Sequence, residues 1–107
     1  MTRQALVVLT TLGTEADARA MVTTLLEKRL IACGTLLPGA RSIYRWEGAL
    51  QEEAEVVVLL KTDASRWSAL SEVVKDRHPY QVPELLALPV EHGLDQYLSW
   101  VTSEVVG

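Results

Sequence analysis

The chain has 107 residues, which fits a single domain and leaves no room for two hydrophobic cores. Hydrophobic residues make up 49% of the chain and charged residues 22%, a balance that excludes a disordered protein. The net charge of −4 excludes a strong basic field for nucleic acid or anionic lipid, and a single cysteine excludes an intrachain disulfide.

The first part of the chain predicts a strand, a helix and a second strand. Residues 5–9 form an unbroken apolar run rich in β-branched side chains, which is typical of a strand. Thr14 can cap a following helix, whose apolar side chains recur at the spacing of one helix face. Residues 30–37 resume a strand, and Pro38-Gly39 then interrupts it with a bend.

A long hairpin is predicted next. Residues 42–46 alternate in character, so Tyr44 and Trp46 share one face. Glu47-Gly48 has the features of a hairpin tip, and the returning arm leads into residues 56–60, the most apolar strand of the chain. The acidic stretch 52–55 on that arm is interpreted as a solvated surface rather than a cation site.

The last part of the chain predicts helix, strand and helix. Asp63 or Ser65 caps a second helix, which ends at His78 because Pro79 disfavours helical backbone in the residue before it. Residues 84–90 form a fourth strand, in which Pro89 favours an edge position. A final helix follows, with an apolar face formed by Leu94, Tyr97, Leu98, Val101 and Val105.

This order of elements predicts an α+β fold over residues 1–107, namely a ferredoxin-like βαββαβ antiparallel sheet with a C-terminal helix. The two unbroken apolar runs, 5–9 and 56–60, would be its central strands. A strand with one wet face should alternate polar and apolar residues, and these two do not. We therefore expect neighbouring copies of the chain to cover the second face of the sheet.

The connector after the second helix carries the strongest candidate site. Pro79 and Pro83 stiffen a segment that holds His78, Tyr80 and Glu84, so an imidazole, a phenol and a carboxylate are preorganised at little entropic cost. The alternative is structural: His78 caps the second helix while Tyr80 packs at an interface. The sequence alone leaves both interpretations open.

Cys33 has two further interpretations beside that of a small buried hydrophobe. It could pair with His78 as a nucleophile, or the two could join carboxylates around copper or zinc, drawn from several subunits.

The chain carries no GxGxxG, Walker A or GxSxG motif, and we expect no enzymatic activity. No stretch resembles a signal peptide or membrane span, so we expect a cytoplasmic protein with no nucleic-acid or membrane partner.

Two motifs in these segments resemble those of the CutA family, the divalent-cation tolerance proteins. They are Ser-Ile-Tyr-x-Trp-x-Gly at 42–48 and His-Pro-Tyr-x-x-Pro-Glu at 78–84, with Leu-Lys-Thr at 60–62 between them. The resemblance implies a ferredoxin-like fold, a tight homotrimer similar to the PII signalling proteins, and a cytoplasmic role in divalent-metal tolerance, above all to copper. No enzymatic reaction is established for the family.

The resemblance also implies a cluster of site residues near the clefts between subunits. His78, Cys33 and Glu84 would be the metal donors for a weakly bound Cu²⁺ or other divalent cation, and the cleft would be lined by Tyr80, Trp46 and Lys61. Some members proposed to bind copper carry a cysteine and a second histidine where this chain has Thr10 and Arg77. The alternative is a PII-like interaction protein with no metal site, whose clefts bind a small anion beside Lys61.

Overall fold

Four antiparallel strands form one sheet in the computed structural model, which describes residues 3–105. The order across the sheet is β2-β3-β1-β4, so β1 and β3 are central and β4 lies at an edge, as their apolar and Pro-bearing sequences predict. This is the ferredoxin-like arrangement. The strands are β1 (Ala5–Leu12), β2 (Cys33–Trp46), β3 (Ala49–Asp63) and β4 (Leu86–Pro89).

The helices begin and end where the sequence supplies caps. The Thr14 hydroxyl accepts a hydrogen bond from the backbone N–H of Asp17 at 3.1 Å and starts α1 (Glu15–Glu27). Asp63 caps a short 3-10 turn, η1 (Ala64–Arg66), which leads into α2 (Trp67–Arg77). The last helix is α3 (Asp95–Glu104). Within the described residues, no helix is both long and apolar enough to cross a membrane.

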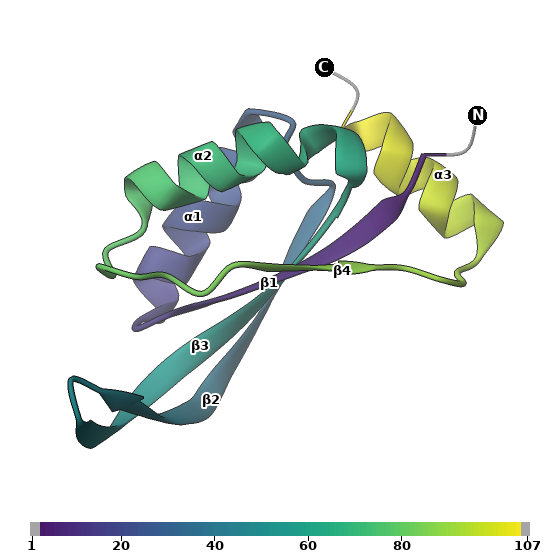
Figure 1. Ribbon diagram of the computed structural model, residues 1–107. Helices are drawn as coiled ribbons and strands as arrows, with labels where there is room; N and C mark the ends of the chain where they lie inside the picture. Colours follow the sequence, from purple (N-terminus) through teal and green to yellow (C-terminus); the bar gives the residue numbers. More distant parts are fainter. Residues whose placement is uncertain (1–2, 106–107) are drawn as a thin grey trace.

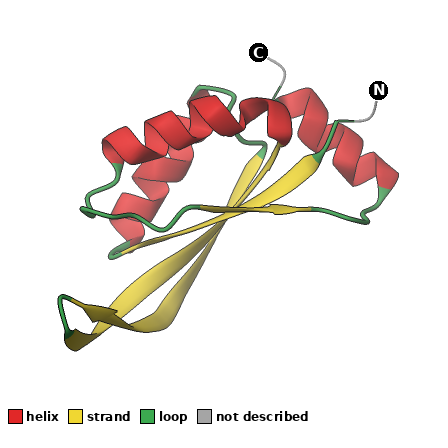
Figure 2. Ribbon diagram, viewed as in Figure 1, coloured by secondary structure: helices red, strands yellow, loops and turns green. Residues whose placement is uncertain are grey.

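Helices α1 and α2 lie together on one side of the sheet (Figures 1 and 2). Alternate residues of the central strands point toward them, so Val8 and Leu60 are buried against Leu25 and Leu70. Helix α3 packs instead at the end of the sheet where β2 begins, with Val101 buried against Ala32. The chain thus builds its main core on one face only.

The opposite face of the sheet is apolar and only partly covered. We call it the uncovered face. Its residues are half-buried on the central strands and exposed on the edge strand, where Leu86 and Leu88 are 55% and 52% exposed. A contiguous apolar surface of this kind is typical of an interface rather than of a monomer's exterior. The uncovered face comprises Val7, Leu9, Val57, Leu59, Leu86 and Leu88.

Strands β2 and β3 extend well beyond the end of β1 as a protruding hairpin (Figure 1). We call residues 40–55 the hairpin arm. An irregularity between Leu37 and Ala40 bends β2 at Gly39, whose φ of +85° suits a residue without a β-carbon. Glu47 and Gly48 both have positive φ at the tip, which is the backbone that a tight two-residue hairpin turn requires.

Some element boundaries differ from those that the sequence predicts. The second strand begins at Cys33 rather than at Leu30, because the backbone N–H of Leu30 closes the end of α1 by donating to the Leu25 carbonyl at 2.9 Å. The Leu30 carbonyl accepts the Thr62 hydroxyl of β3 at 2.7 Å. The fourth strand begins at Leu86 rather than at Glu84. Leu94, expected on the buried face of the last helix, is 81% exposed in the single chain. The local sequence pattern predicts that an element exists, but hydrogen bonds to distant residues decide the residue at which it begins.

Candidate functional site

A large hollow lies between the hairpin arm and the connector that joins α2 to β4. Its volume is about 950 Å³. We call it the Tyr80 hollow. Its lining comes from the end of β1, the hairpin arm and the connector, and comprises Thr11, Gly13, Ser42, Ile43, Tyr44, Trp46, Glu53, Ala54, Glu55, Tyr80, Gln81, Val82 and Glu84.

His78 fixes the start of the connector against β1. Its Nε2 lies 2.7 Å from the Thr11 carbonyl oxygen, which can only accept, so Nε2 carries the proton and donates. Its Nδ1 accepts the backbone N–H of Tyr80 at 3.1 Å. The imidazole is buried, and both of its nitrogens are engaged within the chain. A metal ion could bind this ring only by displacing one of these two hydrogen bonds.

Tyr80 reaches from the connector to the hairpin arm. Its hydroxyl donates to the Glu55 Oε2 atom at 2.5 Å, and its ring lies edge-on to the His78 ring with centroids 4.7 Å apart. Burial raises the pKa of Tyr80 above its usual value, and the hydrogen bond and negative charge of Glu55 raise it further. The protonated Tyr80 hydroxyl therefore links the connector to Glu55 by donating a hydrogen bond.

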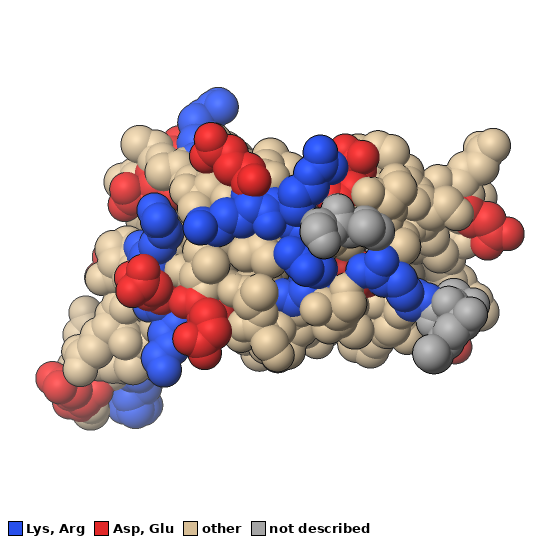
Figure 3. Space-filling model, turned by 90° about the horizontal axis from the view of Figure 1, so that it is seen from above, with Lys and Arg blue, Asp and Glu red and all other residues tan. Residues whose placement is uncertain are grey.

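The charge of the hollow is entirely negative. Glu53, Glu55 and Glu84 line it, and no Lys, Arg or His does so among the described residues. Two aromatic side chains of the hairpin arm, Tyr44 and Trp46, lie along the same wall. By contrast, Lys and Arg side chains form an interrupted band across the side of the molecule that bears α1 and α2 (Figure 3). The hollow is thus suited to a cation rather than to an anion.

Cys33 and Lys61 lie together, away from the Tyr80 hollow. They are direct partners across β2 and β3, and the Lys61 ammonium lies 3.6 Å from the Cys33 sulfur and 2.5 Å from the Thr35 hydroxyl. Lys61 is four strand positions from Val57, the β3 partner of Thr11, which is about 13 Å along a strand. Within one chain, Cys33 and His78 therefore form neither a nucleophile pair nor a shared metal site.

Comparison with known proteins identifies the family. The CutA1 divalent ion tolerance protein family matches residues 6–104. The chain belongs to this family. It is 51% identical over 102 residues to the divalent-cation tolerance protein CutA of Citrobacter koseri, covering 95% of this chain and 89% of that protein.

Solved structures of CutA1 proteins share the fold of this family member. The CutA1 structure from Thermus thermophilus superposes with a TM-score of 0.91 at 43% identity, covering 94% of this chain and 97% of the other. The CutA1 structure from Oryza sativa superposes with a TM-score of 0.93 at 36% identity, covering 96% and 94% of the two chains. The ferredoxin-like fold that the resemblance implies is therefore the one observed.

The structure divides the site residues that the CutA resemblance implies into two groups. Trp46, Tyr80 and Glu84 line the Tyr80 hollow, and His78 lies directly behind it. Cys33 and Lys61 form the separate pair on the sheet. Within residues 3–105, no three His, Cys, Asp or Glu side chains come together in a geometry that would hold a metal ion. A metal site would therefore need donors from a neighbouring subunit.

Sequence reasoning placed Glu53 and Glu55 on a solvated arm: Glu53 is exposed there, but Glu55 is buried, and the position of both at the hollow was missed. Residues two apart on a strand point to the same face, so these two carboxylates share a face of β3 with each other. Their strand partners on β2 are Ser42 and Ala40, which place them on the same face of the arm as Tyr44. That alternation is visible in the sequence, but the contact of Glu55 with Tyr80 is not.

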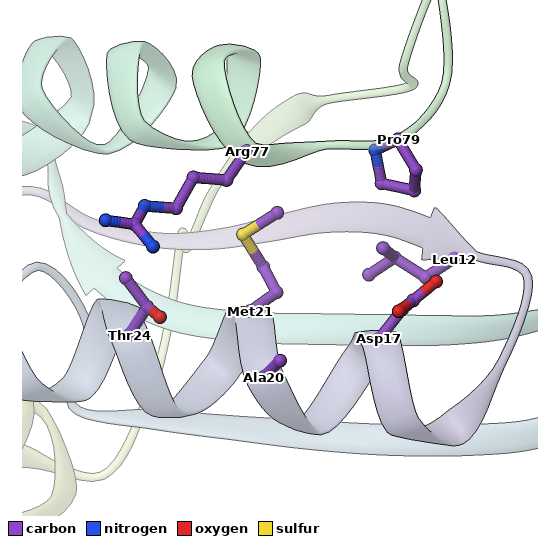
Figure 4. A pocket seen from close by; sticks show the side chains of 7 residues that line it. All are labelled: Leu12, Asp17, Ala20, Met21, Thr24, Arg77 and Pro79. Carbon is purple, nitrogen blue, oxygen red and sulfur yellow. The ribbon is translucent and has the colours of Figure 1, made fainter.

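A second hollow of about 310 Å³ lies between α1 and the end of α2 (Figure 4). Asp17 and Arg77 stand toward its opposite ends, with Met21 between them (Figure 4). Both charged residues are exposed, and the hollow contains none of the residues predicted for the site. Its charges are mixed, unlike those of the Tyr80 hollow.

The Tyr80–Glu55 bond predicts a specific alkaline titration. Because the pKa of Tyr80 is raised in the folded chain, the stability linked to its protonated form is present below its usual pKa of 10 and is lost as pH rises through the raised value. We expect Glu55→Gln to lower the pKa of Tyr80, measured by tyrosinate absorbance, since the neutral amide removes the negative charge. Identical alkaline titrations of wild type and Glu55→Gln would contradict the Tyr80–Glu55 hydrogen bond. The Tyr80→Phe variant is the control, because it shows which part of the tyrosinate absorbance comes from Tyr80.

Proposed function

We propose that this CutA1 family member acts in divalent-cation tolerance as a cytoplasmic homotrimer that binds a cation weakly where subunits meet. The observation that carries the proposal is the uniformly acidic Tyr80 hollow, whose three carboxylates face no basic side chain among the described lining residues. Carboxylates suit divalent cations such as Mn²⁺, Mg²⁺ and Ca²⁺, whereas a thiolate and an imidazole suit copper and zinc.

The trimer is supported by the uncovered face and by the hairpin arm. The face leaves Leu86 and Leu88 exposed, and the arm exposes Ile43 and Leu50, each at 69%. A second chain that packed against these residues would bury both sets of side chains. The edge of β3 along the arm is also free of β1, and a neighbouring strand could pair with it.

The metal donors are proposed in two sets. Glu84, Glu53 and Glu55 would offer oxygen donors at the hollow, and because the three do not converge on one position within the described chain, groups from a neighbour would have to complete any oxygen set. His78 could contribute after giving up a hydrogen bond, and Cys33 from another subunit. The two sets differ in the metal they prefer, which makes them separable by experiment.

Calorimetry of the intact oligomer with Mn²⁺, Zn²⁺ and Cu²⁺ tests the proposal. Saturable Mn²⁺ binding that is lost in Glu84→Gln supports the oxygen set. Saturable Cu²⁺ or Zn²⁺ binding that is lost in Cys33→Ser or His78→Ala supports the softer set. Wild-type protein that binds none of the three ions saturably would overturn direct cation binding and favour a PII-like interaction protein without a metal site.

A further inference from the structure

We propose that the hollow on the helical side of the molecule binds a short zwitterionic peptide, with its ammonium group at Asp17 and its carboxylate at Arg77. This is the hollow of about 310 Å³ between α1 and the end of α2, which we call the α1–α2 hollow. The inference goes beyond the proposed cation site and does not depend on it. Three features carry it: opposite charges at the two ends, the distance between them, and an apolar base.

The charges of the α1–α2 hollow are opposite in sign and lie apart. Figure 4 shows Asp17 at the end marked by Pro79 and the Arg77 guanidinium at the end marked by Thr24. Both charged side chains are exposed, and neither has an ion-pair partner within residues 3–105. A simple cation or a simple anion would be attracted by one end and repelled by the other. A ligand that carries both charges is attracted at both ends.

The length of the hollow selects the separation of the ligand's charges. Its α1 wall is one stripe of that helix, formed by Asp17, Ala20, Met21 and Thr24. The seven residues from the first to the last of these rise by about 10 Å. A charge-assisted hydrogen bond takes up to about 3 Å at each end, so the ligand's own charges should lie about 4–10 Å apart. The terminal groups of an extended dipeptide, about 7 Å apart, fit this range, whereas a free amino acid carries both charges on one carbon.

The middle of the hollow is apolar. Met21 and Leu12 form its base and are 4% and 1% exposed, and Ala20 and Pro79 add apolar surface beside them. An aliphatic side chain of the ligand can pack on this base between the two charged ends. The volume lies at the small end of the range for ligand sites, which suits two amino-acid residues rather than a long chain.

The α1–α2 hollow is on the side of the sheet opposite the uncovered face. Helices α1 and α2, which form its walls, pack together on one side of the sheet (Figure 1). A neighbouring copy that packs against the uncovered face therefore meets the other side of the sheet. The ligand reaches the hollow in an assembly built on that face.

Methyl NMR of the intact protein, titrated with alanyl-leucine, tests this inference. The chain has two methionines, Met1 and Met21, so a labelled Met21 methyl group reports from inside the hollow, and Met21→Leu assigns its signal. We expect a saturable shift of that signal. N-acetyl-alanyl-leucine, which lacks the ammonium group, and alanyl-leucine amide, which lacks the carboxylate, should each bind about tenfold more weakly.

Two charge variants make the test specific to the two ends. Asp17→Asn should abolish the preference for alanyl-leucine over its N-acetyl form, and Arg77→Gln should abolish the preference over its amide. Asp95→Asn and Arg19→Gln are the matched controls, because they make the same changes at exposed helical positions outside the hollow. Both controls should keep both preferences.

Three results would overturn the inference. The first is a Met21 signal that alanyl-leucine does not shift saturably. The second is equal binding of alanyl-leucine, its N-acetyl form and its amide, which would show that the hollow does not recognise the charges. The third is wild-type preferences in both Asp17→Asn and Arg77→Gln. Cation binding at the Tyr80 hollow is tested separately by Glu84→Gln, so either proposal can fail without the other.

Discussion

Replacing His78 by alanine should destabilise the protein by about 2–4 kcal/mol. The change removes the bond from Nε2 to the Thr11 carbonyl and the bond from the Tyr80 N–H to Nδ1. It also leaves the Thr11 carbonyl, in a residue that is 6% exposed, without its donor. Chemical denaturation of the oligomer, compared at equal protein concentration, measures the difference in the free energy of unfolding.

Two further variants distinguish the origin of this loss. His78→Phe keeps a ring of similar size but offers neither nitrogen, so a loss close to that of His78→Ala would assign the effect to the hydrogen bonds. His92→Ala is the histidine control, because its side chain is 91% exposed and its removal should change stability little. A His78→Ala protein as stable as the His92→Ala protein would contradict the positioning role of His78.

The same contacts explain why the connector could be predicted from sequence. Pro79 and Pro83 restrict the backbone whatever surrounds it, so a stiff segment with three polar side chains is a local property of residues 78–84. In the structure, Tyr80 and Glu84 of this segment line the Tyr80 hollow. It also supports the structural alternative for His78, whose backbone N–H ends α2 by donating to the Val74 carbonyl at 2.8 Å.

The role of Glu55 could not be predicted in this way. Its contact with Tyr80 joins residues 25 positions apart, and it depends on where β1 ends against β3. That register is set by the buried pairs of the central strands, such as Val8 with Leu60, and not by the acidic stretch itself. The apolar residues of the central strands thus determine that Glu55 is the carboxylate that contacts Tyr80, although none of these apolar residues lies in the acidic stretch.

The pairing of Cys33 with Lys61 depends on register in the same manner. The sequence places both residues on strands, and the resemblance to the CutA family places both near a subunit cleft. In the single chain they face each other across β2 and β3, apart from the Tyr80 hollow. The central positions of β1 and β3, by contrast, follow directly from their unbroken apolar runs. The apolar composition of a strand predicts that it is buried. The register between strands, which the sequence does not show, decides which polar side chains lie opposite each other.

The uncovered face gives the second large expected effect: Leu88→Glu should convert the proposed homotrimer to a species of lower mass. Leu88 is 52% exposed in the single chain, so a carboxylate there would cost an isolated subunit little. In an assembly that covers this face, each subunit would bury an unpaired charge at a cost of several kcal/mol. Light scattering coupled to size-exclusion chromatography measures the mass directly, and circular dichroism confirms that the variant is folded.

Leu26→Glu is the matched control for this prediction. Leu26 is also a partly exposed leucine, at 42%, but it lies on α1, away from the uncovered face. The same change of charge and volume there should leave the mass of the assembly unaltered. A folded Leu88→Glu protein with the mass of wild type would show that subunits do not meet on this face, and a monomeric wild type would exclude the trimer itself. Loss of assembly in Leu88→Glu alone would place the interface on the face that the two central strands leave apolar.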